Sequence, residues 1–449
     1  MSESHAAAMH PPAVLARWRQ MRAGAGVGGG GGAHAGGGAH AGAGSGAKLM
    51  TLPDAVRAFV KPGDLLYFGG SMARPNAAMF EVARAFWGTS PAFTLAAPAV
   101  ANQHAPLIRG GLVRKVIASI QASTFPTPAP HPCYVEADRS GSVEFEGWSL
   151  LSLVLRLFAG SMGMPFIPVR SLEGTDMAQA LADRQRFAHV KDPFGDGEAA
   201  VIPALSPDVT FVHALAADSA GNTLICPPYY DDQWAAMAGR RVVVTVERIV
   251  DDEFIRRHAH LVRLPASTVD AVCEVPLGGH PNCVPGDLVP EIGGYPDDYA
   301  FLDDLRGAGK SGEALDRWAE TWITGCADHW AYLERLGPER VHALRGRARN
   351  DGWLFDLPAL QAPRRDAPVS EAERHVVLAT RVLRRRLERG GIENILAGLG
   401  LSSLAAWMAA MRLLETGRHV PLMVEAGMVG YLPSPADPFL FNYRNMFNG

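Results

Sequence analysis

The spacing of apolar residues divides the chain into alternating helices and strands. Thr51, with an acidic residue three positions later and Pro53 in the first turn, predicts a helix that runs through Val60. The apolar run at 64–70 then predicts a strand ending in two glycines, and 76–87 has the spacing of an amphipathic helix. Strand, glycine turn and helix together predict a βα unit.

Further strands and helices follow in the same alternation. The strands are apolar at nearly every position, which is typical of a parallel sheet covered by helices on both faces. The strand candidates are 113–120, 165–169, 209–215 and 240–247, and the helix candidates between them are 149–160 and 176–187. The pattern therefore predicts an α/β fold with open, mostly parallel sheets.

A second βα unit is predicted near the end of the sequence. Ser370, with a glutamate three residues later, starts a helix that stops at the pair Gly390 and Gly391. One β-α-β fragment of about 80 residues cannot close a parallel sheet alone, so we expect the second domain to be incomplete. The elements that follow the glycine pair are a strand within 392–400, a helix over 403–415 and a strand over 419–427.

Composition marks the expected domain boundaries. Residues 22–47 are mostly glycine and alanine, a composition that cannot bury enough apolar surface to offset its ordering entropy. Three prolines interrupt the pattern over 358–369. The expected organisation is a disordered tail over 1–47, a large domain over 48–357, a linker over 358–369 and part of a second domain over 370–449.

Charge and cysteine content narrow the classes of partner and compartment. The 42 basic and 46 acidic residues give a net charge of −4, which offers no electrostatic argument for binding nucleic acid or a membrane surface. The five cysteines are scattered and form no C-x-x-C pair, which disfavours a disulfide framework and a zinc cage. We therefore expect a cytoplasmic protein with small-molecule substrates and no metal.

Two apolar stretches bear on targeting. The first 20 residues lack a continuous apolar segment after a basic start, so no signal peptide is expected. Residues 395–411 carry no charge, but glycines and serines interrupt them, and a buried strand, turn and helix explain them better than a membrane span.

Glu425 is the strongest candidate in the sequence for a reactive residue. It directly follows four apolar residues of a predicted buried strand and precedes a glycine-containing turn. A carboxylate is costly to bury without a partner, and ligands of open α/β sheets bind at the carboxyl ends of the strands. A functional carboxylate and a solvated strand-end glutamate that caps the next turn both fit this position.

Glycine turns supply a second kind of candidate. Gly398 and Gly400 lie between a predicted strand and helix, where unshielded N–H groups could hold an oxyanion, and Gly69 with Gly70 lies in the equivalent place of the first unit. A purely structural turn fits both pairs. Glu247 also ends a predicted strand, and an ion pair with nearby Arg248 or Arg256 is one explanation for it.

Several segments together resemble the glutaconate-type coenzyme A transferases of family I. The resemblance covers nearly the whole chain after the tail, as a large subunit joined to the start of a small subunit. The matching stretches are LPDAVRAFVKPGDLLYFGG, RPNAAMFEVAR, GMPFIPVRSLEGTDM, VKDPFGDGEAAVIPALSPDVTFVHALAADSAGN, VVVTVERIVDDEFIRR, DHWAYLERLG, NILAGLGLSSLAA and LMVEAGMVG.

The resemblance implies an acyl-CoA:carboxylate CoA-transferase that works through covalent intermediates on a glutamate. By this resemblance, Glu425 is the nucleophile, and Gly398 and Gly400 belong to the oxyanion hole. The residues implied for the substrate site lie at or near the glycine turns and are Gly69, Gly70, Arg74 and Gly427. It implies CoA thioester as a substrate rather than a bound cofactor.

The same family leaves alternatives open. An acyl-CoA hydrolase or decarboxylase on this scaffold, or a non-catalytic acyl-CoA-binding subunit, would share the fold. Family members pair large and small subunits, so we expect an oligomer or a partner chain that completes the second domain. The acyl donor and acceptor do not follow from the sequence.

Overall fold

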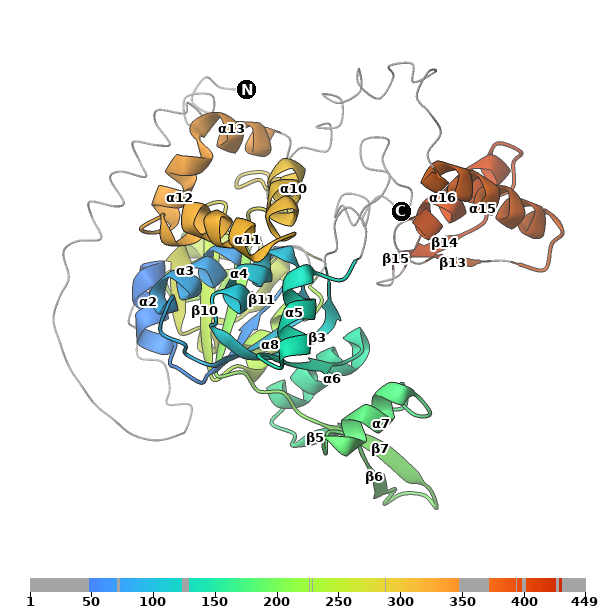
Figure 1. The fold of residues 1–449 in the computed structure, drawn as a ribbon, viewed down its shortest axis with the longest axis horizontal. Helices are drawn as coiled ribbons and strands as arrows, with labels where there is room; N and C mark the ends of the chain where they lie inside the picture. Colours follow the sequence, from blue (N-terminus) through green and yellow to red (C-terminus); the bar gives the residue numbers. More distant parts are fainter. Residues whose placement is uncertain are drawn as a thin grey trace. The chain divides into compact units, whose positions relative to one another are not determined.

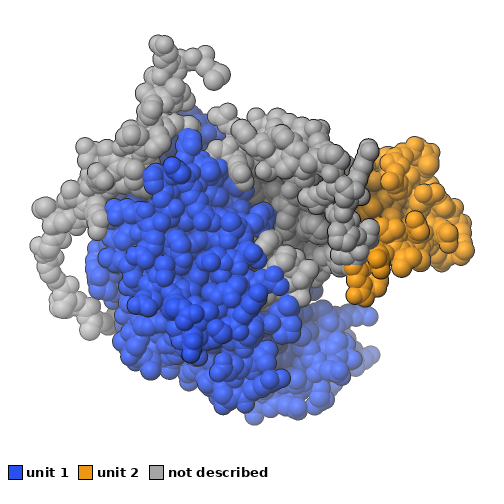
Figure 2. Space-filling view, turned by 45° about the horizontal axis from the view of Figure 1, so that its top comes forward, with its two compact units in different colours: residues 1–345 blue, residues 346–449 orange. Residues whose placement is uncertain are grey.

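The structure is a computed structural model in which two compact units divide after Arg345 (Figure 2). The described residues are 48–70, 73–122, 129–225, 227, 229–286, 288–346, 371–392, 394–397, 401–424 and 428–429. The expected tail over 1–47 and linker over 358–369 lie outside them, so these two assignments stay predictions.

The core of the first unit is a nine-stranded sheet. Its main run is parallel, in the order β12-β10-β8-β1-β2-β3-β4, and β9 and β11 add antiparallel pairs beside β8. The strands are β1 Leu65–Phe68, β2 Phe93–Val100, β3 Val113–Gln121, β4 Glu144–Gly147, β8 Val209–Ala217, β9 Thr223–Leu224, β10 Arg241–Ile249, β11 Val262–Leu264 and β12 Ala271–Glu274.

The direction of winding reverses beside β1. The chain adds β2, β3 and β4 on one side of β1, then returns to place β8, β10 and β12 on the other side. The connections that follow β1 and β8 therefore leave the sheet toward opposite faces. In open α/β sheets, such a reversal at the carboxyl ends of the strands is the usual place for a ligand.

Helices cover both faces of this sheet, as Figure 1 shows. Leu66 and Phe68 of β1 pack in the larger core with α2 to α5 and α10 to α12, whereas Tyr67 points to the opposite core with α6 and α8. The helices are α2 Leu52–Phe59, α3 Asn76–Phe86, α4 Ala105–Arg109, α5 Pro132–Ser140, α6 Leu150–Ser161, α8 Asp232–Ala238, α9 Asp252–Arg257, α10 Tyr299–Ala308, α11 Gly312–Ala319, α12 His329–Leu336 and α13 Pro338–Gly346.

The first βα unit forms as the sequence predicts. Thr51 is the N-cap of α2 and accepts a hydrogen bond from the Asp54 N–H, and Pro53 lies in the first turn. β1 ends one residue before Gly69, and α3 begins after Pro75. Short-range signals were sufficient here because caps and glycines act within a few residues.

One predicted strand belongs to a different sheet. Residues 165–169 were expected in the parallel sheet, but β5 (Phe166–Pro168) pairs antiparallel with β7 (Glu198–Pro203) in a three-stranded sheet with β6 (Ala188–Lys191). Phe166 remains 45% exposed, and Pro168 offers no N–H to a central ladder. This sheet and α7 (Asp176–Asp183) project from the rest of the unit in Figure 1.

The second unit contains a small β-α-β arrangement. β13 (Ile395–Ala397) and β14 (Leu422–Val424) pair in parallel, and α15 (Glu371–Glu388) and α16 (Leu401–Leu414) pack on the sheet. β15 (Met428–Val429) pairs antiparallel with β14. The uncharged stretch 395–411 thus contributes to a strand and a helix, and no helix of the described residues is long and apolar enough to cross a membrane.

Candidate functional site

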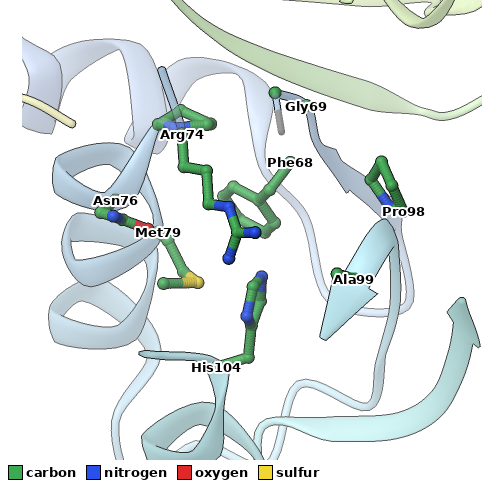
Figure 3. A pocket seen from close by; sticks show the side chains of 10 residues that line it. Phe68, Gly69, Arg74, Asn76, Met79, Pro98, Ala99 and His104 are labelled. Carbon is green, nitrogen blue, oxygen red and sulfur yellow. The ribbon is translucent and has the colours of Figure 1, made fainter. Parts of the chain in front are cut away.

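A cavity lies at the carboxyl ends of β1 and β2, next to the place where the strand order reverses. It is closed on one side by the N-terminus of α3 and on another by the short helix η2 (Asn102–His104), as Figure 3 shows. Its lining residues are Phe68, Gly69, Gly70, Arg74, Pro75, Asn76, Met79, Pro98, Ala99 and His104. The structure therefore brings three of the predicted substrate-site residues, Gly69, Gly70 and Arg74, to one cavity.

The two glycines of this turn are required by the backbone and its neighbours. A Cβ on Gly69 would lie 2.5 Å from Oδ1 of Asp232, which is closer than real Cβ contacts. Gly70 has a φ of +87°, and a Cβ there would lie 2.7 Å from the carbonyl oxygen of Ala73. The glycines thus let the chain pass between the start of α8 and the Ala73–Arg74 backbone.

Arg74 brings a positive charge into an enclosed site. Its Nε atom is buried and has no hydrogen-bond partner in the described structure. Burial lowers the pKa of Arg74, whereas the charges of Asp297, Cys283 and Asp231 oppose that shift. A buried guanidinium with an unused N–H donor has the chemistry to bind an anionic oxygen atom.

His104 faces the same space as the Arg74 guanidinium (Figure 3). The side chain is buried, and the Ala101 N–H donates a hydrogen bond of 3.1 Å to Nδ1. Burial, with the charge of Arg74, lowers the pKa of His104 to about 3, so the imidazole is neutral at physiological pH. Since Nδ1 accepts, the single ring proton is on Nε2.

Asn76, the first residue of α3, fixes the wall of the cavity. Its amide Nδ2 donates to the carbonyl oxygen of Gly279 at 2.7 Å and to Oδ1 of Asn282 at 3.0 Å. The Ala77 N–H donates to the carbonyl of Gly278 at 2.9 Å. These bonds join the start of α3 to a loop about 200 residues later and hold the turn that carries Arg74.

Two adjacent carboxylates lie behind the glycine turn. Asp231 accepts a hydrogen bond of 2.9 Å from the Tyr67 hydroxyl, while its Oδ1 and that of Asp232 are buried without a partner among the described residues. Burial raises the pKa of Asp231 to about 6, and burial together with the charge of Asp231 raises that of Asp232 well above its usual value. Two buried carboxylates in contact with the same turn thus disfavour each other's ionisation.

Glu247 belongs to a buried network rather than to the cavity. It accepts hydrogen bonds from His213, from the Leu277 N–H and from the Tyr295 hydroxyl. Its ion-pair partner is Arg345, with 2.8 Å between Nη2 and Oε2. An ion pair with Arg248 or Arg256 was one explanation that the sequence left open, but the ion pair forms with Arg345. Arg248 is the next residue along the strand, so its side chain points to the opposite face, where it donates to the carbonyl oxygen of Glu291.

The remaining predicted site residues lie outside the described part of the chain. These are Glu425, Gly398, Gly400 and Gly427. Among the described residues no group of three or more His, Cys, Asp or Glu side chains could hold a metal ion.

No motif or apolar pattern in the sequence singles out the cavity residues His104 and Asn76 or the carboxylates Asp231 and Asp232. His104 could have been found as one of the polar residues that directly follow the apolar run 93–101. This run was not recognised as the strand β2, because it is rich in alanine and contains Pro98. The carboxylate pair gave no local signal, since its burial depends on contact with the distant Gly69.

Comparisons with known proteins agree with this fold. The coenzyme A transferase family model matches residues 49–275. One of the glutaconate CoA-transferase subunits of Acidaminococcus fermentans is 29% identical over 314 residues, covering 67% of this chain and 95% of the relative. One of the 3-oxoadipate CoA-transferase subunits of Pseudomonas knackmussii is 29% identical over 296 residues, covering 65% of this chain and 98% of the relative.

A solved structure shows the same fold. The crystal structure of glutaconate coenzyme A-transferase from Acidaminococcus fermentans superposes with a TM-score of 0.60 at 27% identity, covering 66% of this chain and 95% of that chain. This chain belongs to the coenzyme A transferase family. It is an acyl-CoA:carboxylate CoA-transferase of the glutaconate type, which confirms the family, fold class and reaction that the sequence predicts.

Proposed function

We propose that this chain transfers CoA with Glu425 as its nucleophile. The observation that carries the proposal is the pairing of β13 with β14: the strands are parallel, and their last residues, Ala397 and Val424, lie opposite each other. Gly398 and Glu425 are the next residues along the chain. This supports a nucleophile and a glycine turn at the same, carboxyl edge of the small sheet.

The proposed reaction has two covalent stages. The Glu425 carboxylate attacks the thioester carbonyl of the acyl-CoA, the C–S bond breaks, and an acyl-glutamyl anhydride and CoA thiolate form. The thiolate then attacks the glutamyl carbonyl, which releases the first carboxylate and leaves a glutamyl-CoA thioester. An acceptor carboxylate attacks this thioester and takes the CoA through the same steps in reverse, which restores Glu425.

The glycine turns serve binding and charge stabilisation in this proposal. The N–H groups at Gly398 and Gly400 stabilise the oxyanion of the tetrahedral intermediates, where one such donor contributes roughly 3 kcal/mol. Gly427 leaves space for the substrate beside the nucleophile. In the first unit, Gly69 and Gly70 shape the cavity and Arg74 binds an anionic oxygen of the substrate.

The family resemblance also supports proposals about assembly and location. The relatives reported above are named as subunits, so we propose that the active enzyme is an oligomer or includes a partner chain that completes the second unit. We propose a cytoplasmic enzyme, in keeping with five scattered cysteines that form no C-x-x-C pair. Light scattering of the purified chain, alone and co-expressed with its genomic neighbours, measures the assembly.

Intact-mass analysis after incubation with short acyl-CoAs tests the nucleophile. The wild-type chain should gain a CoA-sized adduct that borohydride or hydroxylamine removes, and Glu425→Ala should gain none. Glu415→Gln is the matched control, because Glu415 is an exposed carboxylate paired with Arg412 near the end of α16. An adduct that persists in Glu425→Ala would exclude this nucleophile; thioester hydrolysis without an adduct would point to a hydrolase.

A further inference from the structure

The lobe formed by residues 165–203 has a small sheet with one covered face and one bare face. Ala200 and Ile202 of β7 point into a core with Leu172 and with Leu181 of α7. Residues directly opposite each other in antiparallel strands share a face, so the register of β5, β7 and β6 assigns the side chains of the other face. These side chains are all apolar, and they are Phe166, Pro168, Ala188, Val190, Ala199, Val201 and Pro203.

The bare face is open to solvent. Phe166 is 45% exposed and Val190 is 37% exposed, although apolar residues on both faces are typical of a sheet that is covered on both sides. The lobe projects from the rest of its unit (Figure 1). An uncharged apolar surface of this kind is the usual sign of a contact with another protein surface.

Phe194 adds an apolar knob to the lobe. It lies in the turn between β6 and β7, and it is 97% exposed. Its N–H donates a hydrogen bond of 2.8 Å to Oδ1 of Asp192, which holds the turn that presents the ring. Aromatic side chains that are buried on association are frequent anchors of protein interfaces. The lobe therefore carries both a knob and an apolar face that can receive one.

The two ends of the lobe have opposite charge. The turn at 192–197 contains Asp192 and Asp196 and no basic residue. At the other end, where the chain enters β6, Arg184 and Arg186 each have side chains that are 45% exposed. They belong to a cluster with two more bases than carboxylates, made of Lys115, Arg156, Arg184 and Arg186 around Glu144 and Glu146. A second lobe therefore fits the first in charge when the two run antiparallel.

We propose that two copies of this chain associate through their lobes, with the bare faces packed against each other in antiparallel orientation. Phe166 lies opposite Pro203, at the end of the face away from the turn, so this orientation brings Phe194 of each copy to the Phe166 end of the other. The contact is isologous, because each copy supplies the same knob and the same face. The inference rests on the oligomer proposed above and names its surface.

The area of the contact sets its strength. A fully exposed phenylalanine such as Phe194 brings about 200 Å² to an interface. Two knobs and two small faces together bury on the order of 1,000 Å², which is the lower limit for a specific interface. The association of two lobes is therefore expected to be weak, with a dissociation constant in the micromolar range, and to depend on protein concentration.

Sedimentation velocity of the full chain between about 1 and 100 µM measures this association. The wild type should shift from monomer to dimer, and Phe194→Asp should raise the dissociation constant at least about tenfold. Val190→Lys, which puts a charge on the bare face, should act in the same direction. Leu288→Asp is the matched control, because Leu288 is also an exposed apolar residue, at 54%, but lies outside the lobe. Circular dichroism verifies that each variant folds.

Cysteine cross-linking tests the antiparallel orientation. Within one chain, positions 166 and 194 are separated by at least the length of β7, roughly 17 Å, which is too far for a disulfide. A mixture of Phe166→Cys and Phe194→Cys chains, treated with a mild oxidant, should form disulfide-linked dimers above the wild-type background. Neither variant alone should do so, since antiparallel lobes keep like positions apart. A dimer linked in Phe194→Cys alone would overturn the orientation.

A charge exchange tests the complementarity of the two ends. Asp196→Arg and Arg186→Glu should each weaken the dimer, and the double variant should recover much of the lost affinity, because each acidic end then meets a reversed partner. Losses of affinity that simply add would show that the two ends do not meet.

The remaining outcomes separate this surface from other occupants. If an oligomer forms and Phe194→Asp leaves its dissociation constant unchanged, the oligomer stands and the lobe is not its surface. If β6 and β7 are protected from hydrogen exchange equally at all concentrations, the same chain covers the face and the inference is wrong. A chain that stays monomeric also overturns it, whether or not the CoA adduct forms at Glu425, so the assembly and the reaction are judged separately.

Discussion

Arg345 binds Glu247 from 98 residues further along the chain, with 2.8 Å between Nη2 of the arginine and Oε2 of the glutamate. The glutamate side chain is 1% exposed, and the ion pair joins α13 to the carboxyl end of β10. Helix α13 is thereby attached to the sheet by a carboxylate that has almost no access to bulk solvent, which makes the stability of this unit sensitive to the ionisation of one residue.

The first prediction concerns this ion pair. Burial alone would raise the pKa of Glu247, but the hydrogen bond from His213 and the charge of Arg345 lower it from 4.5 to about 2. A depressed carboxyl pKa stabilises the folded state above pH 4.5, and the contribution is lost as the pH falls from 4.5 toward 2. Glu247→Gln should therefore cost roughly 3 kcal/mol at about pH 7, measured by urea unfolding.

The difference in unfolding free energy between the wild type and Glu247→Gln should become smaller as the pH is lowered to about 3. Asp316→Asn serves as the control, because the Asp316–Arg109 pair is largely exposed and should contribute about 1 kcal/mol or less. A difference that stays constant from about pH 7 to about pH 3 would contradict a lowered pKa at Glu247.

The second prediction concerns the carboxylate pair behind the glycine turn. The pKa of Asp232 is raised, so ionisation destabilises the folded state as the pH rises above the unfolded value of 3.8. Asp232→Asn should raise the calorimetric melting temperature at about pH 8 and leave it nearly unchanged at about pH 4. Asp316→Asn, at a carboxyl whose pKa is lowered, should show the opposite sign. An equal effect of Asp232→Asn at both pH values would show that Asp232 titrates normally.

The third prediction concerns Gly69. Because an added Cβ would lie 2.5 Å from Asp232 Oδ1, Gly69→Ala should cost about 1–3 kcal/mol of unfolding free energy. Gly147→Ala is the control: a Cβ there meets no atom within 4 Å, and the effect should be within about 0.5 kcal/mol. The double variant Gly69→Ala, Asp232→Ala should recover most of the lost unfolding free energy, since the closest contact is between these two residues. If the effects of the two substitutions on the unfolding free energy simply add, this contact is not the cause of the loss.

The fourth prediction concerns Asn76. Its amide holds Gly279 and Asn282, and Asn76→Ala leaves the buried Gly279 carbonyl without that donor. The change should cost about 1–3 kcal/mol and increase hydrogen exchange at the start of α3. Gln179→Ala removes an exposed hydrogen bond to Asp183 and should have little effect on either measurement. Unchanged exchange in Asn76→Ala would mean that the loop does not depend on this amide.

Local signals in the sequence were sufficient for much of the fold. The cap at Thr51, the glycines after β1 and the amphipathic pattern of α3 act over a few residues, and the structure forms the βα unit they predict. The same signals placed Gly69, Gly70 and Arg74 in one turn, and the structure finds them in one cavity. The family resemblance added the reaction, which no local pattern could supply.

Tertiary structure alone decided the partners of these elements. Apolar run length identified 165–169 as a strand but not its sheet, and the alanines of β2 concealed the strand that positions His104. Glu247 forms its ion pair with Arg345 and not with the adjacent Arg248. The carboxylate of Asp232 lies beside Gly69, which is far away in the sequence. The sequence by itself determined where most helices and strands of the first βα unit form, because caps, glycines and periodicity act over a few residues. The packing of distant elements decided which apolar segments are buried and which polar groups meet inside.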